Sequence, residues 1–180
     1  MTTSRQEAQW VLRAQCDDRE ALECLLRSIQ PSLRRFASGV VGASQADDVL
    51  QDVFVIVCRR LKSLHAPELF RPWVYRITSR EAFRHLKKVR RWADHTLETP
   101  ELDDLPAQIV RPPAELLAEL LSLDEVSAAS RAVLALHFQE ELTLAEVAAI
   151  LELPLGTVKS RLSYGLNAIR KRLRKNRGES

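Results

Sequence analysis

The sequence predicts an all-α protein made of two small helical domains joined by an acidic, proline-containing linker. Glycine is scarce, with five residues among 180, and β-branched residues do not fall in alternating runs, so helix is the expected element. Apolar residues instead recur at steps of three and four, the period of a helix with one buried face. Four of the eight prolines lie between residues 94 and 113, where they disfavour helix. We therefore expect helical domains at 1–92 and 114–180, with 93–113 as the linker.

The distribution of charge separates the same parts of the chain. The formal net charge is +3, but residues 93–125 hold nine acids against one base and sum to −8, which leaves +11 on the rest. Two basic bodies on either side of an acidic stretch indicate a polyanionic partner for each domain. The polar N-terminus lacks the apolar core of a signal peptide, and no apolar stretch approaches the roughly 18 residues that span a bilayer. We therefore expect a cytoplasmic protein.

Capping residues and a proline mark the first half of the first domain. Asp17 and Asp18 can cap a helix that runs to about Gln30, with its leucines and isoleucine on one face. Pro31 suits the first turn of the next helix, and Gly42 ends it. The pattern predicts two consecutive helices, divided at Pro31.

The second half of this domain predicts two further helices. Ser44 can cap a helix from about Gln45 to Leu64. Its apolar residues recur at steps of four, three and four, as in a buried stripe: Leu50, Phe54, Val57 and Leu61. Pro72 lies near the start of the last helix, which should end around Trp92.

The second domain should begin with two short helices, 114–123 and 124–138. Thr143 and Glu146 then have the spacing of a capping box, which opens a helix that ends at Leu151. A break follows at Glu152, and Pro154 suits the first turn of the last helix. That helix has a stripe for burial: Val158, Leu162, Leu166, Ile169 and Leu173.

A short helix, a tight break and a longer helix describe a helix-turn-helix, whose second helix can enter a major groove. Between Pro154 and Arg177 there are eight basic residues and no acid. We predict that side chains off the apolar stripe contact duplex DNA: Thr157, Lys159, Ser160, Arg161, Ser163 and Tyr164. A solvated basic helix at the end of a bundle would explain the tail from Arg170, but not the capped short helix and the break before it.

The last helix of the first domain mixes aromatic and basic residues. Residues 70–92 contain five of the ten aromatics and eight basic residues, with Glu81 as the one acid. Aromatic rings among phosphate-binding cations suit single-stranded nucleic acid, because every base has a face to stack. We predict such contacts for seven side chains: Trp73, Tyr75, Arg76, Arg80, Arg84, Lys87 and Lys88. The alternative is that some of these aromatics are core, covered by the arginines.

A third group lies near the start of the helix expected from Gln45. Asp47, Asp48, Gln51 and Asp52 occupy the polar side of an otherwise apolar helix. On their own they describe a solvated face near a helix N-terminus. The three cysteines include no C-x-x-C pair, and the four histidines are scattered, so no metal site, cofactor or catalytic residue is predicted.

Three segments resemble the extracytoplasmic-function sigma factors of bacterial RNA polymerase, and they occur in the order found in that family. Asp47-Asp48-Val49-Leu50-Gln51-Asp52-Val53-Phe54 resembles the region-two signature, usually D-L-V-Q-E-V-F. Phe70-Arg71-Pro72-Trp73-Val74-Tyr75-Arg76-Ile77 is similar to the helix that melts DNA and reads the minus-ten element. The segment from Pro154 to Leu162 is similar to the region-four recognition helix.

The resemblance implies a non-enzymatic factor that directs core polymerase to promoters by binding and melting promoter DNA. Asp47, Asp48, Gln51 and Asp52 would dock on the coiled coil of the largest polymerase subunit. Residues 75–91 would hold the melted minus-ten element, and the last helix would read the minus-thirty-five element. The acidic linker would thread the channel that later carries RNA. Many relatives are held by an anti-sigma factor, so one is a possible partner.

The chain departs from the family pattern at several positions. The family usually has asparagine where this chain has Arg80, and often aspartate where it has Arg84, so the minus-ten base preference is left open. Glu152 and Glu141 stand where the family has glycine, from which we predict that these turns avoid positive φ.

Two other classes of function are weighed against the sigma factor. A helix-turn-helix regulator that binds duplex DNA without polymerase would need an effector or dimerisation domain at the N-terminus, where this chain has a basic, aromatic helix. A nuclease would need clustered carboxylates or histidines for metal or acid–base chemistry, and the sequence offers none.

Overall fold

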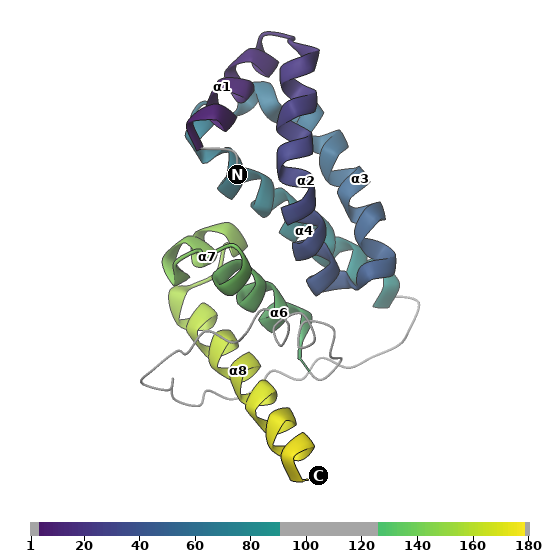
Figure 1. The fold of residues 1–180 in the computed structure, drawn as a ribbon, viewed down its shortest axis with the longest axis vertical. Coiled ribbons are helices and arrows are strands. Elements are labelled where there is room, and N and C mark those ends of the chain that lie inside the picture. Colours follow the sequence, from purple (N-terminus) through teal and green to yellow (C-terminus); the bar gives the residue numbers. More distant parts are fainter. Residues whose placement is uncertain (1–3, 91–125, 179–180) are drawn as a thin grey trace. The chain divides into compact units, whose positions relative to one another are not determined.

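The computed structural model describes residues 4–90 and 126–178, which form helices joined by short turns, with no strand among them (Figure 1). The chain divides into two compact units, Met1–Lys87 and Lys88–Ser180. The all-α prediction is confirmed. The predicted linker 93–113 and the predicted helix 114–123 lie outside the described residues.

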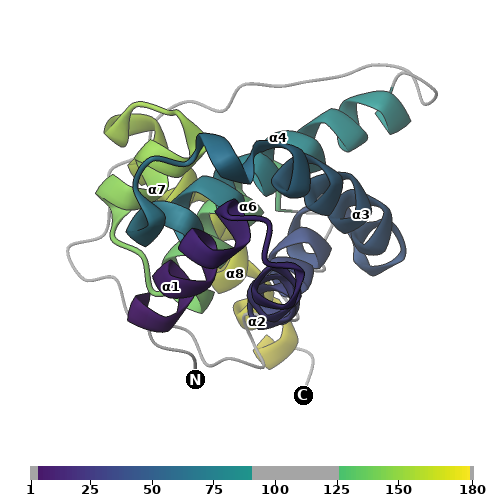
Figure 2. The same cartoon turned by 90° about the horizontal axis from the view of Figure 1, so that it is seen from above.

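The first unit contains four α-helices and two 3-10 turns. Its elements are α1 (Ser4–Gln15), α2 (Arg19–Val41), α3 (Ala43–Arg60), the turns η1 (Leu61–Ser63) and η2 (Pro67–Leu69), and α4 (Phe70–Arg90). Helix α2 packs against both α1 and α3. Figures 1 and 2 show α4 running past α2 and α3, and side-chain contacts join it to both. The core of the unit lies among these helices.

A single continuous helix, α2, replaces the two helices predicted on either side of Pro31. Asp18 caps it as predicted, because its carboxylate accepts the Ala21 N–H at 3.0 Å. A proline inside a helix costs about 3 kcal/mol. However, one buried face continues across Pro31: Ala21, Leu25, Ile29, Leu33, Phe36 and Val40. Burial of each large apolar side chain contributes about 1.5–3 kcal/mol, so the shared stripe outweighs the cost of Pro31.

Helix α3 begins and ends earlier than predicted. Gly42, at φ 93°, ends α2 as predicted and also takes the N-cap position of α3, where Ser44 had been expected. The helix stops at Arg60 because the chain tightens into η1. There the Gln15 side-chain amide donates to the carbonyl oxygens of Leu61 and Leu64 at 2.9 and 2.8 Å. This contact from α1 gives the Leu64 carbonyl a donor and the Leu61 carbonyl a second one, since Leu61 also accepts the Leu64 N–H at 3.0 Å.

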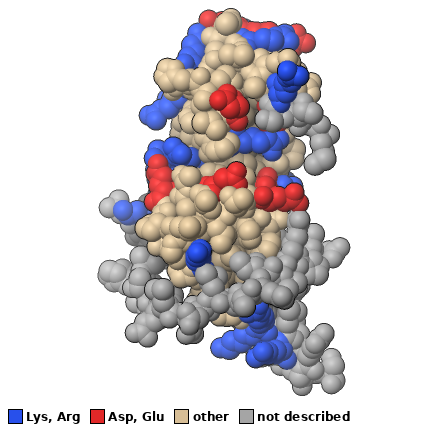
Figure 3. All heavy atoms as spheres, turned by 90° about the vertical axis from the view of Figure 1, so that its left-hand side faces the viewer, with Lys and Arg blue, Asp and Glu red and all other residues tan. Residues whose placement is uncertain are grey.

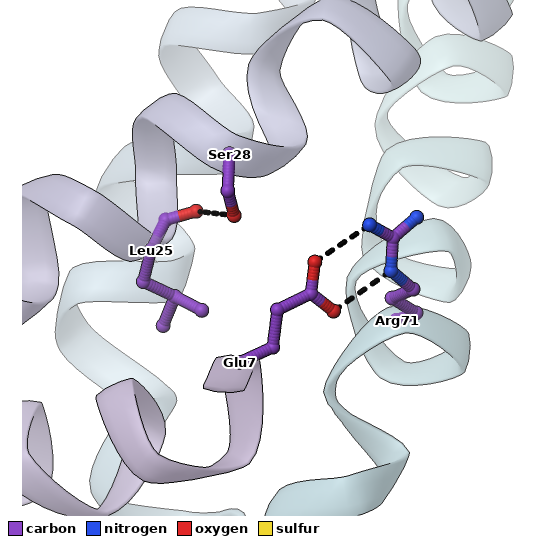
Figure 4. Close-up of polar contacts among 4 residues, drawn as sticks. All are labelled: Glu7, Leu25, Ser28 and Arg71. Carbon is purple, nitrogen blue, oxygen red and sulfur yellow. Dashed lines mark hydrogen bonds and ion pairs between the residues drawn. The ribbon is translucent and has the colours of Figure 1, made fainter. Parts of the chain in front are cut away.

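A buried ion pair joins α1 to the first turn of α4. Glu7 accepts two hydrogen bonds from the Arg71 guanidinium, at 2.6 and 2.7 Å (Figure 4). The same view shows the Ser28 hydroxyl bonded to the Leu25 carbonyl inside α2. The Glu7 side chain is 4% exposed and that of Arg71 41%. The two-point geometry therefore fixes the start of α4 against α1.

Residues 126–178, the described part of the second unit beyond α4, form three α-helices and one π-helical turn. These elements are α6 (Ala128–Leu134), the π-helical turn η3 (Ala135–Gln139), α7 (Leu144–Leu151) and α8 (Leu155–Gly178). Helix α6 starts at Ala128, later than predicted, because the Ser127 hydroxyl caps it by accepting the Ser130 N–H. Helices α6 and α7 both pack on α8. A Cβ on Gly165 of α8 would lie 2.8 Å from a methyl carbon of Leu134, so glycine permits this close approach of α6.

The prediction that Glu141 and Glu152 avoid positive φ is wrong. Their φ angles are 57° and 55°, in the left-handed region, and Glu152 is the C-cap of α7. The chain must reverse between α7 and α8 within three residues, and the Leu153 N–H bonds the Ala148 carbonyl at 3.0 Å to close the helix end. That geometry needs a left-handed residue at the cap whatever its side chain is.

Candidate nucleic-acid interface

Helices α7 and α8 form the predicted helix-turn-helix. The capping box is confirmed: the Glu146 carboxylate accepts the Thr143 N–H at 2.8 Å, and the Thr143 hydroxyl accepts the Glu146 N–H. The Thr143 hydroxyl also donates to the Glu146 carboxylate at 2.7 Å, and this bond, together with the one from the Thr143 N–H, holds the pKa of the Glu146 carboxyl below its ordinary value. Val158 and Leu162 of α8 are buried, as expected of the predicted stripe. The opposite side of α8 is thereby turned away from the core.

The start of α8 presents a mixed set of polar side chains. Lys159 and Tyr164 are exposed, while Thr157 and Ser160 are half-buried. The Ser160 hydroxyl donates to the Thr157 carbonyl at 3.0 Å. Arg161 is half-buried, and desolvation lowers its pKa from the ordinary value, although an arginine stays charged at neutral pH. Lys159 and Tyr164 are therefore the side chains best able to reach a groove.

Ser163, one of the side chains predicted to contact DNA, is buried in this structure. The residue is 2% exposed and lies on the core side of α8, next to the close packing at Gly165. Serine is small and polar, so the sequence did not distinguish a groove contact from a space-saving core position. Only a change in the packing of α8 would bring this hydroxyl to DNA.

The C-terminal half of α8 carries a cluster of cations. Arg170, Lys171 and Arg174 line a shallow depression with Asn167, whose side chain accepts a hydrogen bond from Arg170. Figure 3 shows Lys and Arg side chains gathered on this part of the helix. Such a surface suits backbone phosphates and carries no base preference.

The α4 residues that were predicted to contact melted DNA differ in how exposed they are. Arg80, Lys87 and Lys88 are exposed, and Arg76 is half-buried. Trp73 is half-buried and lies against Phe70, with the two ring centroids 6.2 Å apart. This leaves part of the Trp73 ring available for stacking.

Tyr75, one of the side chains predicted to stack on melted bases, is buried in this structure. Tyr75 is 2% exposed and packs edge-on against Phe36 of α2, with the centroids 5.6 Å apart and the planes at 89°. The ring therefore belongs to the core of the first unit. Stacking here would require it to leave that core.

The polar face of α3 is partly paired with arginines of its own chain. Asp47 accepts two hydrogen bonds from Arg34 of α2, at 2.8 and 3.1 Å, which hold the pKa of the Asp47 carboxyl below its ordinary value. Asp52 accepts one from Arg84 of α4, at 3.3 Å. Asp48 and Gln51 are exposed. Among the described residues, Asp48 makes no ion pair, so its carboxylate is the most accessible of the three.

Two family comparisons match these two units. Residues 25–92 match the Sigma-70 region 2 family, and residues 122–171 match the Sigma-70 region 4 family. The chain belongs to the extracytoplasmic-function sigma factors. It is 29% identical over 186 residues to the RNA polymerase sigma-H factor of Pseudomonas aeruginosa, covering 96% of each chain. It is 27% identical over 171 residues to the ECF RNA polymerase sigma-E factor of Escherichia coli K12, covering 88% of this chain and 90% of the relative.

Two solved structures share the fold of this sigma factor. CnrH, solved in complex with the cytosolic domain of CnrY, superposes with a TM-score of 0.62 at 21% identity and covers 94% of this chain and 98% of its own. RpoE of Bartonella quintana, solved with the anti-sigma factor NepR, has a TM-score of 0.64 at 22% identity, covering 84% and 96%. The sigma factor directs RNA polymerase to promoters.

Sequence reasoning missed one exposed apolar residue on α3 of the sigma factor. Val55 is 43% exposed. It follows Asp48 and Asp52 at the spacing i, i+4, i+7, so these three side chains share one helix face. The sequence shows this spacing, but an apolar residue in a helix is expected to be buried, so Val55 was not predicted as part of the polar face.

The described parts of the sigma factor contain neither a metal-binding cluster nor a membrane-spanning helix. Within residues 4–90 and 126–178, no three His, Cys, Asp or Glu side chains gather where they could hold a metal ion. No helix within these two ranges is long and apolar enough to cross a bilayer.

Proposed function

We propose that three helices of this sigma factor bind three different partners. Helix α3 docks on core polymerase, α4 holds the melted minus-ten strand, and α8 reads the duplex at the minus-thirty-five element. The proposal assigns docking and melting to residues 1–92 and duplex binding to 114–180. The observation that carries it is the separation of chemistry: α3 exposes carboxylates, whereas the outer sides of α4 and α8 expose cations.

Helix α8 acts on duplex DNA through two kinds of contact. Lys159 and Tyr164 lie at the start of the helix, where a recognition helix meets base edges. Arg170, Lys171 and Arg174 lie further along and bind phosphates. The first pair contributes sequence preference and the second group contributes affinity.

Helix α4 acts on unpaired bases. Trp73 supplies a partly open ring, and Arg80, Lys87 and Lys88 supply exposed cations for the backbone of the strand. The bidentate pair between Glu7 and Arg71 fixes the first turn of α4, two residues before Trp73. A rigid start of α4 reduces the conformational entropy lost when a base stacks on Trp73.

Helix α3 docks on the coiled coil of the largest polymerase subunit. Asp48, Gln51 and Asp52 offer acceptors to basic side chains there, and Val55 adds apolar area one turn beyond Asp52. Asp47 is held by Arg34, so its role is to orient that part of the face.

Other assignments follow from this role. The factor is not an enzyme, because the polymerase supplies the chemistry and this chain supplies binding. It acts in the cytoplasm, where polymerase and promoters meet. The acidic linker, 93–113, threads the channel that later carries RNA. An anti-sigma factor regulates the chain, an assignment supported by RpoE of Bartonella quintana, which was solved with one.

The test is promoter-specific transcription by reconstituted holoenzyme. Core polymerase with the purified chain should produce transcripts from a small set of genomic fragments, and sequencing the DNA recovered with the holoenzyme gives both promoter elements. Core alone and the chain alone are the controls. Specific duplex binding by the chain without core, combined with no added transcription, would instead identify a plain helix-turn-helix regulator.

A further inference from the structure

The docking surface and the melted-strand surface meet at one ion pair. Arg84 of α4 donates to the Asp52 carboxylate of α3 at 3.3 Å, and Arg84 also pairs with Glu81, one turn before it on α4. Asp52 belongs to the proposed docking face, and Arg84 was predicted as a contact for melted DNA. Each side chain is thus engaged by the other before either partner binds.

The charges of this cluster oppose DNA binding by Arg84 in the free protein. One guanidinium faces two carboxylates, so the three side chains together carry a formal charge of −1. Two carboxylates beside the guanidinium weaken its attraction for a phosphate, and loss of the Asp52 contact raises the formal charge of the remaining pair from −1 to 0 and strengthens that attraction. The Glu81 side chain is 12% exposed, whereas Asp52 is 61% and Arg84 65% exposed. Asp52 is therefore the carboxylate that a partner can reach.

The contact with Asp52 is weak enough to be exchanged. Solvent-exposed ion pairs shift an equilibrium by no more than about fivefold. A basic side chain of polymerase that binds Asp52 competes with Arg84 for the carboxylate and places a like charge beside the guanidinium. Both effects favour release of Arg84 from Asp52.

We propose that the Asp52–Arg84 pair couples the two partners, so that docking of core polymerase on Asp52 releases Arg84 for the phosphates of the melted strand. This inference rests on the proposed function of α3 and α4 and adds a regulatory contact to it. Coupling between two binding events is reciprocal. Loss of Arg84 therefore strengthens polymerase docking, and loss of Asp52 strengthens DNA binding by the free chain.

Polymerase affinity gives the first test. Arg84→Gln in the full-length chain should bind core polymerase about two- to fivefold more tightly than the parent, measured by titration of a fluorescently labelled chain. Lys88→Gln is the matched control, because it removes the same charge from the same helix and, among the described residues, Lys88 has no ion pair with α3. A merely structural role for Arg84 would weaken docking instead. In an Asp52→Asn background the gain should disappear.

Single-strand affinity gives a second test that needs no polymerase. The free full-length chain is titrated against a labelled 15-nucleotide oligo-dT. Asp52→Asn should bind about two- to fivefold more tightly than the parent, and Asp48→Asn, which removes a charge from the same helix face, should bind less tightly than Asp52→Asn. The difference between the two should vanish when Arg84→Gln is added.

The outcomes separate the coupling from the proposed function. Equal effects of Arg84→Gln and Lys88→Gln on docking, or of Asp52→Asn and Asp48→Asn on oligo-dT binding, would overturn the coupling while the parent still docks and initiates. A parent chain that fails to dock on core polymerase would overturn the proposed function itself.

Discussion

The ion pair between Glu7 and Arg71 predicts an asymmetric cost of mutation. Arg71→Met leaves the Glu7 carboxylate, which is 4% exposed, buried without its partner. Removal of one partner of a buried pair costs about 3–5 kcal/mol, and we expect the lower end, about 3 kcal/mol, because Arg71 itself is partly exposed. Glu7→Gln keeps an acceptor and leaves Arg71 within reach of water, so it should cost only about 1 kcal/mol.

Tryptophan fluorescence can measure this cost in the intact chain. Trp10 and Trp73 lie in the first unit and α6–α8 contain no tryptophan, so tryptophan excitation reports the first unit once Trp92 is replaced by phenylalanine in every variant. With a denaturant slope of about 1–3 kcal/mol per molar urea, Arg71→Met should lower the urea midpoint by at least about 1 M. Arg27→Met, which removes an exposed ion pair of α2, is the control and should shift it little.

The double variant decides between an ion pair and simple packing. Glu7→Gln combined with Arg71→Met removes both charges, so its stability should recover toward that of Glu7→Gln alone. If the two single costs instead add, or if Glu7→Gln costs as much as Arg71→Met, then burial of the Glu7 carboxylate is not the source of the asymmetry.

The remaining surfaces predict functional losses. Tyr164→Ala should weaken minus-thirty-five duplex binding by about 1–3 kcal/mol in a fluorescence anisotropy titration of the holoenzyme, whereas Ser163→Ala should not change it, because that hydroxyl is buried. Trp73→Ala should leave closed-promoter binding unchanged but disfavour promoter opening by about 1–3 kcal/mol. Permanganate reactivity of unpaired thymines measures the opening, and a premelted bubble should restore part of the loss. Reversal of both Asp48 and Asp52 to lysine should abolish co-purification with core polymerase while the helical circular dichroism stays intact; unimpaired co-purification would place docking elsewhere.

Local signals in the sequence were sufficient for the helix starts that depend on neighbouring residues. Asp18 and Thr143 cap the helices as predicted, because a cap joins a side chain to an amide three residues away. The helix-turn-helix followed from the same kind of signal. Pro31 was misjudged because the cost of a proline is local, whereas the burial that offsets it comes from packing against α1 and α3.

The sequence predicted which types of residue form the candidate surfaces, but not always whether a given side chain faces solvent or the core. Tyr75 stands in a basic, aromatic run, but its contact with Phe36 joins residues 39 positions apart. The pair of Asp52 with Arg84 spans 32 positions and links two surfaces that the sequence presented as separate. Both depend on how α2, α3 and α4 pack, which periodicity alone does not specify.

The left-handed turn residues lead to a substitution that is expected to stabilise the protein, whereas most substitutions destabilise it. A non-glycine residue in the left-handed region costs about 1–2 kcal/mol, and Glu152 sits there at φ 55°. Glycine removes that cost. It also makes the unfolded chain more flexible, which lowers the free energy of unfolding by about 0.4–1 kcal/mol. Glu152→Gly should therefore stabilise the second unit by about 0.5 kcal/mol.

Glu140 supplies the matched control for this turn. Its φ is −98°, a conformation that any residue adopts, so no backbone strain is present to relieve. Glu140→Gly should therefore only make the unfolded chain more flexible and destabilise the second unit. Differential scanning calorimetry of the full-length chain should show the transition of the second unit raised by Glu152→Gly and lowered by Glu140→Gly. The stabilised variant should keep its minus-thirty-five affinity, because Glu152 is not among the α8 side chains assigned to DNA. Two equal decreases in the transition temperature would mean that the side chain of Glu152 contributes more than its backbone strain costs.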